Sequence, residues 1–267
     1  MNLHHERGTW IDPKDCNVLS HEELQQRIQT NRVILLGETH TSAEIHRWQL
    51  HMMAGIFAIQ PKMSVGYEMF PRRVQRVLDE WTAGELEKDE FLEKVEWGKV
   101  WGHDSSLYMP LFDFCRQKNV RMLGINCRRD LVTQVGKEGW EAIPEDERDG
   151  LTPAKPASQE HKDYLIRITG GHFQKDYPIE RFARAQQTWD RAFACNIAAA
   201  LKEDPTQKII GIIGRGHLEY GYGTPYQLAD LGIDDVLILL PSFSKELEKE
   251  KIAGIGDGLF RLDSIED

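Results

Sequence analysis

The chain has 267 residues, of which 40% are hydrophobic and 28% charged, so it can build one large domain with a real core. Its formal net charge of -10 argues against nucleic acid or an anionic membrane as the main partner, because both attract a cationic face. The polar first residues lack an export signal, and no segment reaches the ~20 apolar residues of a transmembrane helix. The sequence as written therefore predicts a cytoplasmic location; a native start other than Met1 would leave a periplasmic or membrane-associated location open.

Five short apolar segments predict buried β-strands. They are rich in Val, Ile, Leu or Met and show little polar alternation, which is typical of a parallel sheet covered on both faces. Helical patterns separate them, so strand and helix alternate along the chain. The fold class predicted is α/β, a mainly parallel sheet flanked by helices. The strand segments are residues 33–37, 64–69, 120–126, 208–214 and 235–240.

Two regions hold more helix than a strand crossover needs. They predict helical insertions at about residues 72–105 and 136–205, which form a small all-helical subdomain beside the sheet. Around them we expect an N-terminal extension over residues 1–30 and the α/β domain over residues 31–243. Residues 244–267 alternate apolar and charged side chains, which predicts a solvated C-terminal tail.

Polar residues follow the predicted strands. The stretches "VILLGETHTS" and "GIIGRGHLEYGYGTP" both end an apolar run in Gly-x-x-His, with His40 and His217 as the histidines. Glu38 ends the first strand, Glu68 the second, and Asn126 the third. The carboxyl ends of parallel strands lie along one edge of a sheet, where ligands of open α/β folds bind. The two motifs therefore predict one crevice with two imidazoles.

These residues also have structural explanations. A single Gly-x-x-His is common by chance. For Glu68, the alternative to a functional role is a structural ion pair with Arg72, Arg128 or Arg215. His172 is equally consistent with loop capping and with a pocket, and Trp97 and Trp101 fit a core better than a ligand stack. Dinucleotide, P-loop, nucleophile-elbow and H-E-x-x-H motifs are all absent from the sequence.

The order of several motifs resembles the ChaN-like haem-binding uptake family. The segments are "VILLGETHTSAEIHRWQL", "GYEMF", "WGHDSSLYMPLFDFCRQKNVRMLGIN", "GGHF" with "ARAQQTWDRAFACNIA", and "GRGHLEYGYGTP". The resemblance runs from about residue 30 to 240. It implies a parallel sheet with a small helical domain, haem binding in bacterial iron uptake, a tyrosine iron ligand, and haem at a homodimer interface. The family also resembles a wider superfamily of Tiki-type metalloproteases and erythromycin esterases.

Haem binding is the first functional hypothesis, favoured mainly by this resemblance. Tyrosinate is a hard donor suited to ferric iron, and an aromatic crevice at the carboxyl edge of the sheet would cover the macrocycle. Histidines and helix N-termini would hold the propionates. The candidate haem-binding residues are Tyr220 and Tyr222 as first choices for the iron, then Tyr67 and Tyr108, with His40, His172 and His217.

A metal-assisted hydrolase, of esterase or peptidase type, is the second hypothesis. The superfamily resemblance implicates Glu38, His40, Glu68 and His217 in a hydrolytic site. Two carboxylates and two imidazoles can bind a divalent ion and activate water. Without metal, Glu38 would act as the base while His217 stabilises charge.

Overall fold

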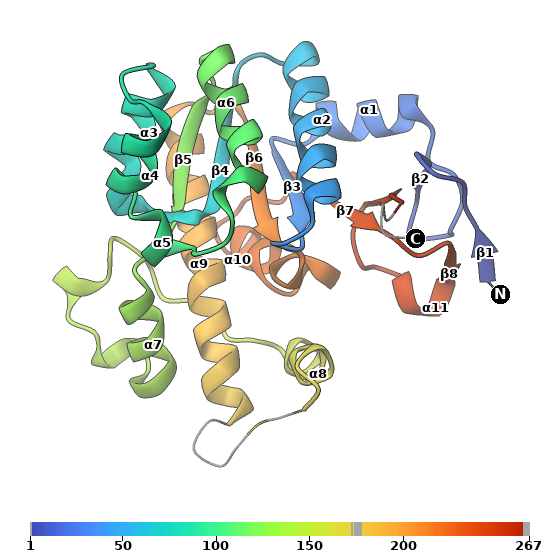
Figure 1. Ribbon diagram of the computed structural model, residues 1–267. Helices are drawn as coiled ribbons and strands as arrows, with labels where there is room; N and C mark the ends of the chain where they lie inside the picture. The colour runs from blue at the N-terminus through green and yellow to red at the C-terminus, as the bar shows by residue number, and fades with distance from the viewer. Residues whose placement is uncertain (1, 172, 174–177, 264–267) are drawn as a thin grey trace.

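The computed structural model describes residues 2–171, 173 and 178–263, and its centre is a seven-stranded sheet (Figure 1). The strand order is β2-β9-β7-β3-β6-β4-β5, and every neighbouring pair except β2 with β9 is parallel. The five strands expected from the sequence are all present, which confirms the predicted α/β class. The strands are β2 (Trp10–Ile11), β3 (Val33–Glu38), β4 (Met63–Pro71), β5 (Arg121–Asn126), β6 (Lys208–Gly214), β7 (Val236–Ser242) and β9 (Gly258–Arg261).

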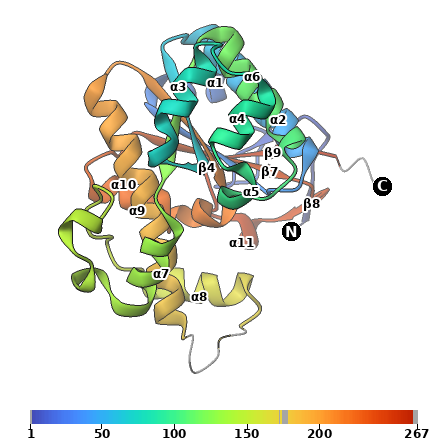
Figure 2. The same cartoon turned by 60° about the vertical axis from the view of Figure 1, so that its left-hand side comes forward.

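Helices cover both faces of this sheet (Figures 1 and 2). The α-helices are α1 (His21–Thr30), α2 (Ala43–Ile59), α3 (Gln75–Thr82), α4 (Lys88–Lys94), α5 (Trp97–Val100), α6 (Met109–Lys118), α7 (Arg129–Glu138), α8 (Gln159–Ile168), α9 (Ile179–Glu203), α10 (Thr224–Asp230) and α11 (Lys249–Ile252). Short 3₁₀ helices are η1 (Arg72–Val74), η2 (Ser105–Leu107), η3 (Trp140–Ala142), η4 (Glu145–Glu147), η5 (Arg215–His217) and η6 (Glu219–Gly221). In the described part of the chain, no helix has the length and apolar character needed to cross a bilayer.

The alternation of side chains along β3 shows why the strands are apolar throughout. Ile34 and Leu36 belong to a cluster with residues of α2, α3, α4 and α6, whereas Val33 and Leu35 belong to a cluster with residues of α9 and α10. Because successive strand residues point to opposite faces, a sheet buried on both sides needs apolar residues at every position. All six residues of β3 are buried accordingly.

Three helices lie together beyond the carboxyl ends of the strands, whereas α3, α4 and α5 of the expected insertion 72–105 pack on the core of the sheet, so the two insertions do not form one subdomain. In both views α7, α8 and the N-terminal half of α9 project past the sheet, while the C-terminal half of α9 packs on it (Figures 1 and 2). The long helix α9 therefore belongs to both parts. Some of its side chains pack in the core against the sheet, and others reach the edge where the Gly-x-x-His motifs lie.

The expected solvated tail is wrong. β9 pairs in parallel with β7 inside the main sheet, and Leu259 is buried there. Ile252 and Ile255 are buried as well, so the apolar members of the alternating pattern face the core. The first residues contribute too, since β2 pairs with β9, and β1 (Asn2–His4) pairs with β8 (Glu246–Glu248) in a separate ribbon. Both chain ends thus extend the domain beyond residues 31–243.

Candidate functional site

The two Gly-x-x-His motifs end neighbouring strands. β3 and β6 run side by side in parallel, with Glu38 opposite Gly214. The two motif-bearing strands are therefore direct neighbours in the sheet. The loops that follow the strands carry His40 and His217 to the same crevice.

His40 is held by a carboxylate from its own loop. Its Nδ1–H donates to Oε1 of the buried Glu38 at 2.6 Å, and the Tyr108 hydroxyl donates to the same oxygen at 3.3 Å. Nδ1 of the buried His46 lies 3.3 Å from Glu38 Oε2. Burial opposes a charge on His40, but the bond to Glu38 and the charge of Glu68 outweigh it and raise the pKa of His40. With Nδ1 engaged, Nε2 is the ring atom left for the crevice.

His217 is held in the same way by a carboxylate from α9. Its Nδ1–H donates to Oδ1 of Asp190 at 2.9 Å, and the Thr224 hydroxyl donates to that oxygen at 2.9 Å. Burial disfavours the charged ring, but the charge and hydrogen bond of Asp190, with the charge of Glu68, raise the pKa of His217 to about 9. These interactions favour the protonated form of His217 at neutral pH.

Glu68 lies between the two histidines. It accepts a hydrogen bond from the backbone N–H of Gly214, and its Oε1 is 3.8 Å from His217 Nε2. Burial raises the pKa of Glu68, while the charges of His217 and His40 partly offset this effect. The charged partners of Glu68 are these histidines rather than an arginine.

Gly214 makes this convergence possible. A Cβ there would lie 3.0 Å from His40 Cε1 and 3.3 Å from Glu68 Oε2, closer than ordinary packing allows. At the next strand, the Asn126 side-chain amide donates to the backbone oxygen of Glu68 at 2.6 Å and so joins the ends of β4 and β5.

These residues open into a crevice of about 530 Å³ at the carboxyl edge of the sheet. Its walls combine imidazoles, large aromatic rings and cations. The ring of His103 lies 5.4 Å from that of His40, and Trp101 lies 4.6 Å from His40, centroid to centroid. The lining side chains include His40, Glu68, Trp101, His103, Trp189, His217, Arg73, Lys99, Arg128 and Arg129.

The candidate tyrosines lie away from this opening. Among the residues that the structure describes, no tyrosine lines the crevice. Tyr67 and Tyr108 are fully buried, with hydroxyls engaged by Leu111 O and by Glu38 and His40 O, respectively. Tyr220 and Tyr222 stack on each other with centroids 5.5 Å apart, and the Tyr220 hydroxyl donates to Lys251 O. His172 lies outside the described residues.

Sequence reasoning did not find four residues of this site. Asp190 sits within a long helical pattern, and its only sequence signal is an acidic residue inside the buried stretch "TWDRAFA". His46 is buried on α2, and its Nδ1 lies 3.3 Å from Glu38 Oε2. Trp101 was expected in the core but lines the crevice, together with His103.

Within the described ranges, no group of three or more His, Cys, Asp or Glu side chains is arranged to hold a metal ion. The cluster of Glu38, His40, Glu68 and His217, together with Asp190, instead forms two histidine–carboxylate pairs, Glu38–His40 and Asp190–His217, around the third carboxyl group of Glu68. The geometry gives the metal-assisted hydrolase no support. What the cluster offers is imidazole nitrogens fixed in direction and a buried carboxyl with a raised pKa.

The fold and site define an α/β protein with a polar crevice at the carboxyl edge of a parallel sheet. The family model described as "Haem-binding uptake, Tiki superfamily, ChaN" matches residues 24–228. Because this match covers more than half of the chain, the protein belongs to that family.

Solved structures share the fold. The structure titled "Cofacial heme binding to ChaN of Campylobacter jejuni" is 18% identical, with 94% of this chain and 95% of that chain covered and a TM-score of 0.72. An erythromycin esterase, EreC, is 13% identical, with 87% and 76% covered and a TM-score of 0.51. At these identities the likeness shows the fold alone. No curated protein sequence matches the chain.

Proposed function

We propose that the protein binds haem in the crevice between His40, His103 and His217. The observation that carries the proposal is one cavity that joins carboxylate-held imidazoles, two tryptophans and four cationic side chains. The family match supports haem as the ligand class. The volume of about 530 Å³ lies within the range of ordinary ligand and cofactor sites.

His40 is the residue we propose for the iron. A histidine that ligates a metal usually donates its other ring N–H to a carboxylate, which fixes the tautomer and the ring orientation. The Glu38–His40 pair has this form, and the His40 side chain lines the crevice and is 36% exposed. Because the pKa of His40 is raised, iron would compete with a proton for Nε2, and binding should weaken as the pH falls.

The cations of the crevice would hold the propionates. Arg73, Lys99, Arg128 and Arg129 all line it, although the whole chain is strongly acidic. Arg129 has no carboxylate partner among the described residues, so its charge remains available. The imidazolium of His217 adds a further positive charge deeper in the site. Trp101 and Trp189 would cover the apolar macrocycle.

Ligation of the haem iron by a tyrosine stays a prediction alongside ligation by His40. Tyr220 and Tyr222 follow His217 in the same loop but stack toward His161 of α8. Iron uptake as the cellular role, and a homodimer that encloses the haem, also stay part of the proposal. Size-exclusion chromatography with light scattering, with and without haemin, tests the homodimer.

A haemin titration followed by absorbance tests the proposal. We expect a saturable Soret band that His40→Ala weakens by about tenfold in affinity and shifts in position. His51→Ala is the matched control, because His51 is exposed on α2. If His40→Ala keeps the wild-type band and affinity while Tyr220→Phe or Tyr222→Phe changes the band, the ligand is a tyrosine.

The second candidate function is metal-free acid–base hydrolysis, and the placement of Glu68 favours it. A buried carboxyl with a raised pKa, between two imidazoles whose Nδ1 atoms are fixed, is suited to general acid–base catalysis. An esterase screen tests this hypothesis. Activity that persists after treatment with chelator and disappears in Glu68→Gln supports it, and no activity above a heat-denatured control contradicts it.

A further inference from the structure

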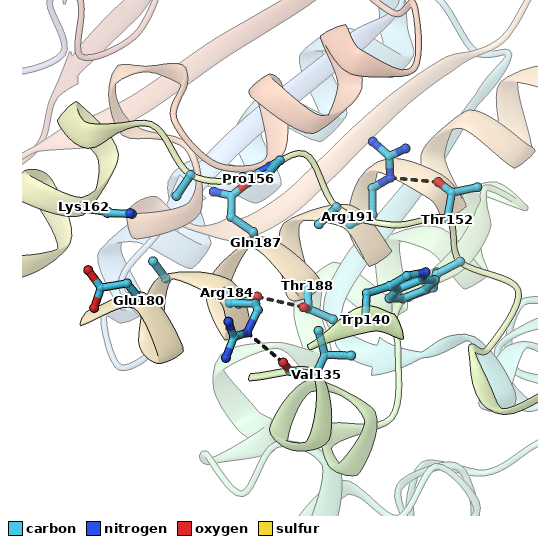
Figure 3. A pocket seen from close by; sticks show the side chains of 14 residues that line it. Val135, Trp140, Thr152, Pro156, Lys162, Glu180, Arg184, Gln187, Thr188 and Arg191 are labelled. Atoms are coloured by element: carbon cyan, nitrogen blue, oxygen red, sulfur yellow. Dashed lines mark hydrogen bonds between the residues drawn. The ribbon is translucent and has the colours of Figure 1, made fainter. Parts of the chain in front are cut away.

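A second cavity lies on the other side of α9. It has a volume of about 340 Å³ and is bounded by α9, the end of α7, Trp140 of η3 and the extended segment 151–157 (Figure 3). The helix contributes Ala183, Gln187 and Thr188 to this cavity but Gln186 and Trp189 to the crevice. With 3.6 residues per turn these two sets lie on opposite faces of the helix, so the cavities are separate.

The wall formed by segment 151–157 is fixed in place. Arg191 Nε donates to the Thr152 hydroxyl at 2.9 Å. At the other end, the Gln227 amide accepts from Lys155 N at 3.0 Å and donates to Lys155 O at 2.8 Å. These hydrogen bonds fix the segment to α9 at Thr152 and to α10 at Lys155, so the cavity beneath it is a defined part of the fold.

The interior surface is mainly apolar. Trp140, Val135, Leu151 and Ala183 face the space, and most polar groups around it are already bonded to protein. The Thr188 hydroxyl donates to Arg184 O at 2.8 Å. The Gln187 amide bonds to His161, Tyr222 O and Gln227. A ligand would therefore place an apolar body here.

The remaining charge on the walls is positive. Arg191 is paired with Asp230 at 2.7 Å. Lys162 and Arg184 form no ion pair with a carboxylate in the described residues, and Glu180 is the single carboxylate on the wall. Two cations against one anion leave an excess positive charge. Figure 3 shows Lys162 and Glu180 at one end of the cavity and Trp140 at the other.

We propose that this cavity binds a small amphipathic anion, with an apolar ring or short chain against Trp140 and a carboxylate or sulfonate at Lys162. The volume is at the lower end of the range for small-molecule sites, which suits one or two rings. The site is independent of the haem crevice, because the two cavities share no lining residue, although α7 and α9 contribute to both. Its ligand binds whether or not haem does.

Isothermal titration calorimetry with anilinonaphthalenesulfonate tests the proposal on the full chain. We expect binding of one equivalent. Ala157→Phe, which fills the cavity from its partly exposed side, should weaken it at least about tenfold, and Ala183→Leu should do the same. Lys162→Ala should weaken it about threefold, as expected for a partly exposed charge pair. Lys118→Ala is the control, because Lys118 is exposed on α6.

Three results would overturn the proposal. They are no measurable binding to the wild type, wild-type affinity in a folded Ala157→Phe protein, and loss of binding in His40→Ala with retention in the cavity variants. The last result would place the probe in the crevice. If both filling variants fail to fold, the comparison of Lys162→Ala with Lys118→Ala decides, and equal affinities would contradict the site.

Discussion

The two Gly-x-x-His strand ends look alike in sequence but are held by different parts of the molecule. His40 takes its carboxylate from Glu38, two residues away in the same loop. His217 takes its carboxylate from Asp190 on α9, 27 residues away along the chain. The His40 side chain is 36% exposed and that of His217 only 14% exposed. One histidine is therefore oriented by local structure and the other by tertiary packing.

This difference supports different roles for the two histidines in the proposed haem site. The more exposed His40 lines the crevice and suits ligand contact. The more buried His217, with its pKa raised to about 9, suits a fixed positive charge. The Asp190–His217 pair joins α9 to the end of β6. We therefore expect this pair to contribute more to the stability of the fold than to ligand binding.

Asp190→Ala should have the largest effect on stability. It would leave the buried His217 without its partner, and removal of one member of a buried pair typically costs about 3–5 kcal/mol in the free energy of unfolding. Urea denaturation measures this cost. Asp146→Ala, at an exposed aspartate of η4, should change stability by less than about 0.5 kcal/mol. Equal stabilities for the two variants would contradict the tertiary role of Asp190.

The pH dependence of the unfolding free energy should also report on the Asp190–His217 pair, with a slightly smaller change than the one expected for Asp190→Ala. The folded pKa of His217 lies above its unfolded value, so the stabilisation is complete below pH 6.5 and is lost as the pH rises through about 9. The loss amounts to about 3 kcal/mol. Unfolding free energies from pH 6 to 10 measure it. Asp190→Asn should flatten this slope, and an unchanged slope would show that another group titrates.

Gly223→Ala should have a moderate effect. A Cβ there would overlap the backbone oxygen of His217 and lie 2.7 Å from Asp190 Oδ1, so the pair would have to shift. We expect a loss of about 1–3 kcal/mol in thermal or urea unfolding, as for other overpacked positions. Gly216→Ala is the matched control, because its nearest atom is Ile168 Cδ1 at 3.9 Å. A Gly223→Ala protein as stable as this control would contradict the close packing.

The sequence predicted what depends on local patterns. The five strands follow from apolar runs, and Glu38, Glu68, Asn126 and His217 were expected together because each comes at a strand end. Asp190 was missed, since a helix pattern does not say which polar side chain turns toward the sheet edge. β9 was missed because its alternation of apolar and charged residues fits a solvated tail as well as a strand. Only the pairing of β9 with β7 distinguishes the two.

A double-mutant cycle on haemin affinity tests the central claim most directly. The claim is that His40 and His217 serve one ligand. We expect His40→Ala and His217→Ala each to weaken haemin binding by about tenfold, and the double variant to weaken it by clearly less than about a hundredfold, because neighbouring groups are not additive. Wild-type affinity in either folded single variant, or full additivity in the double variant, would contradict a shared site.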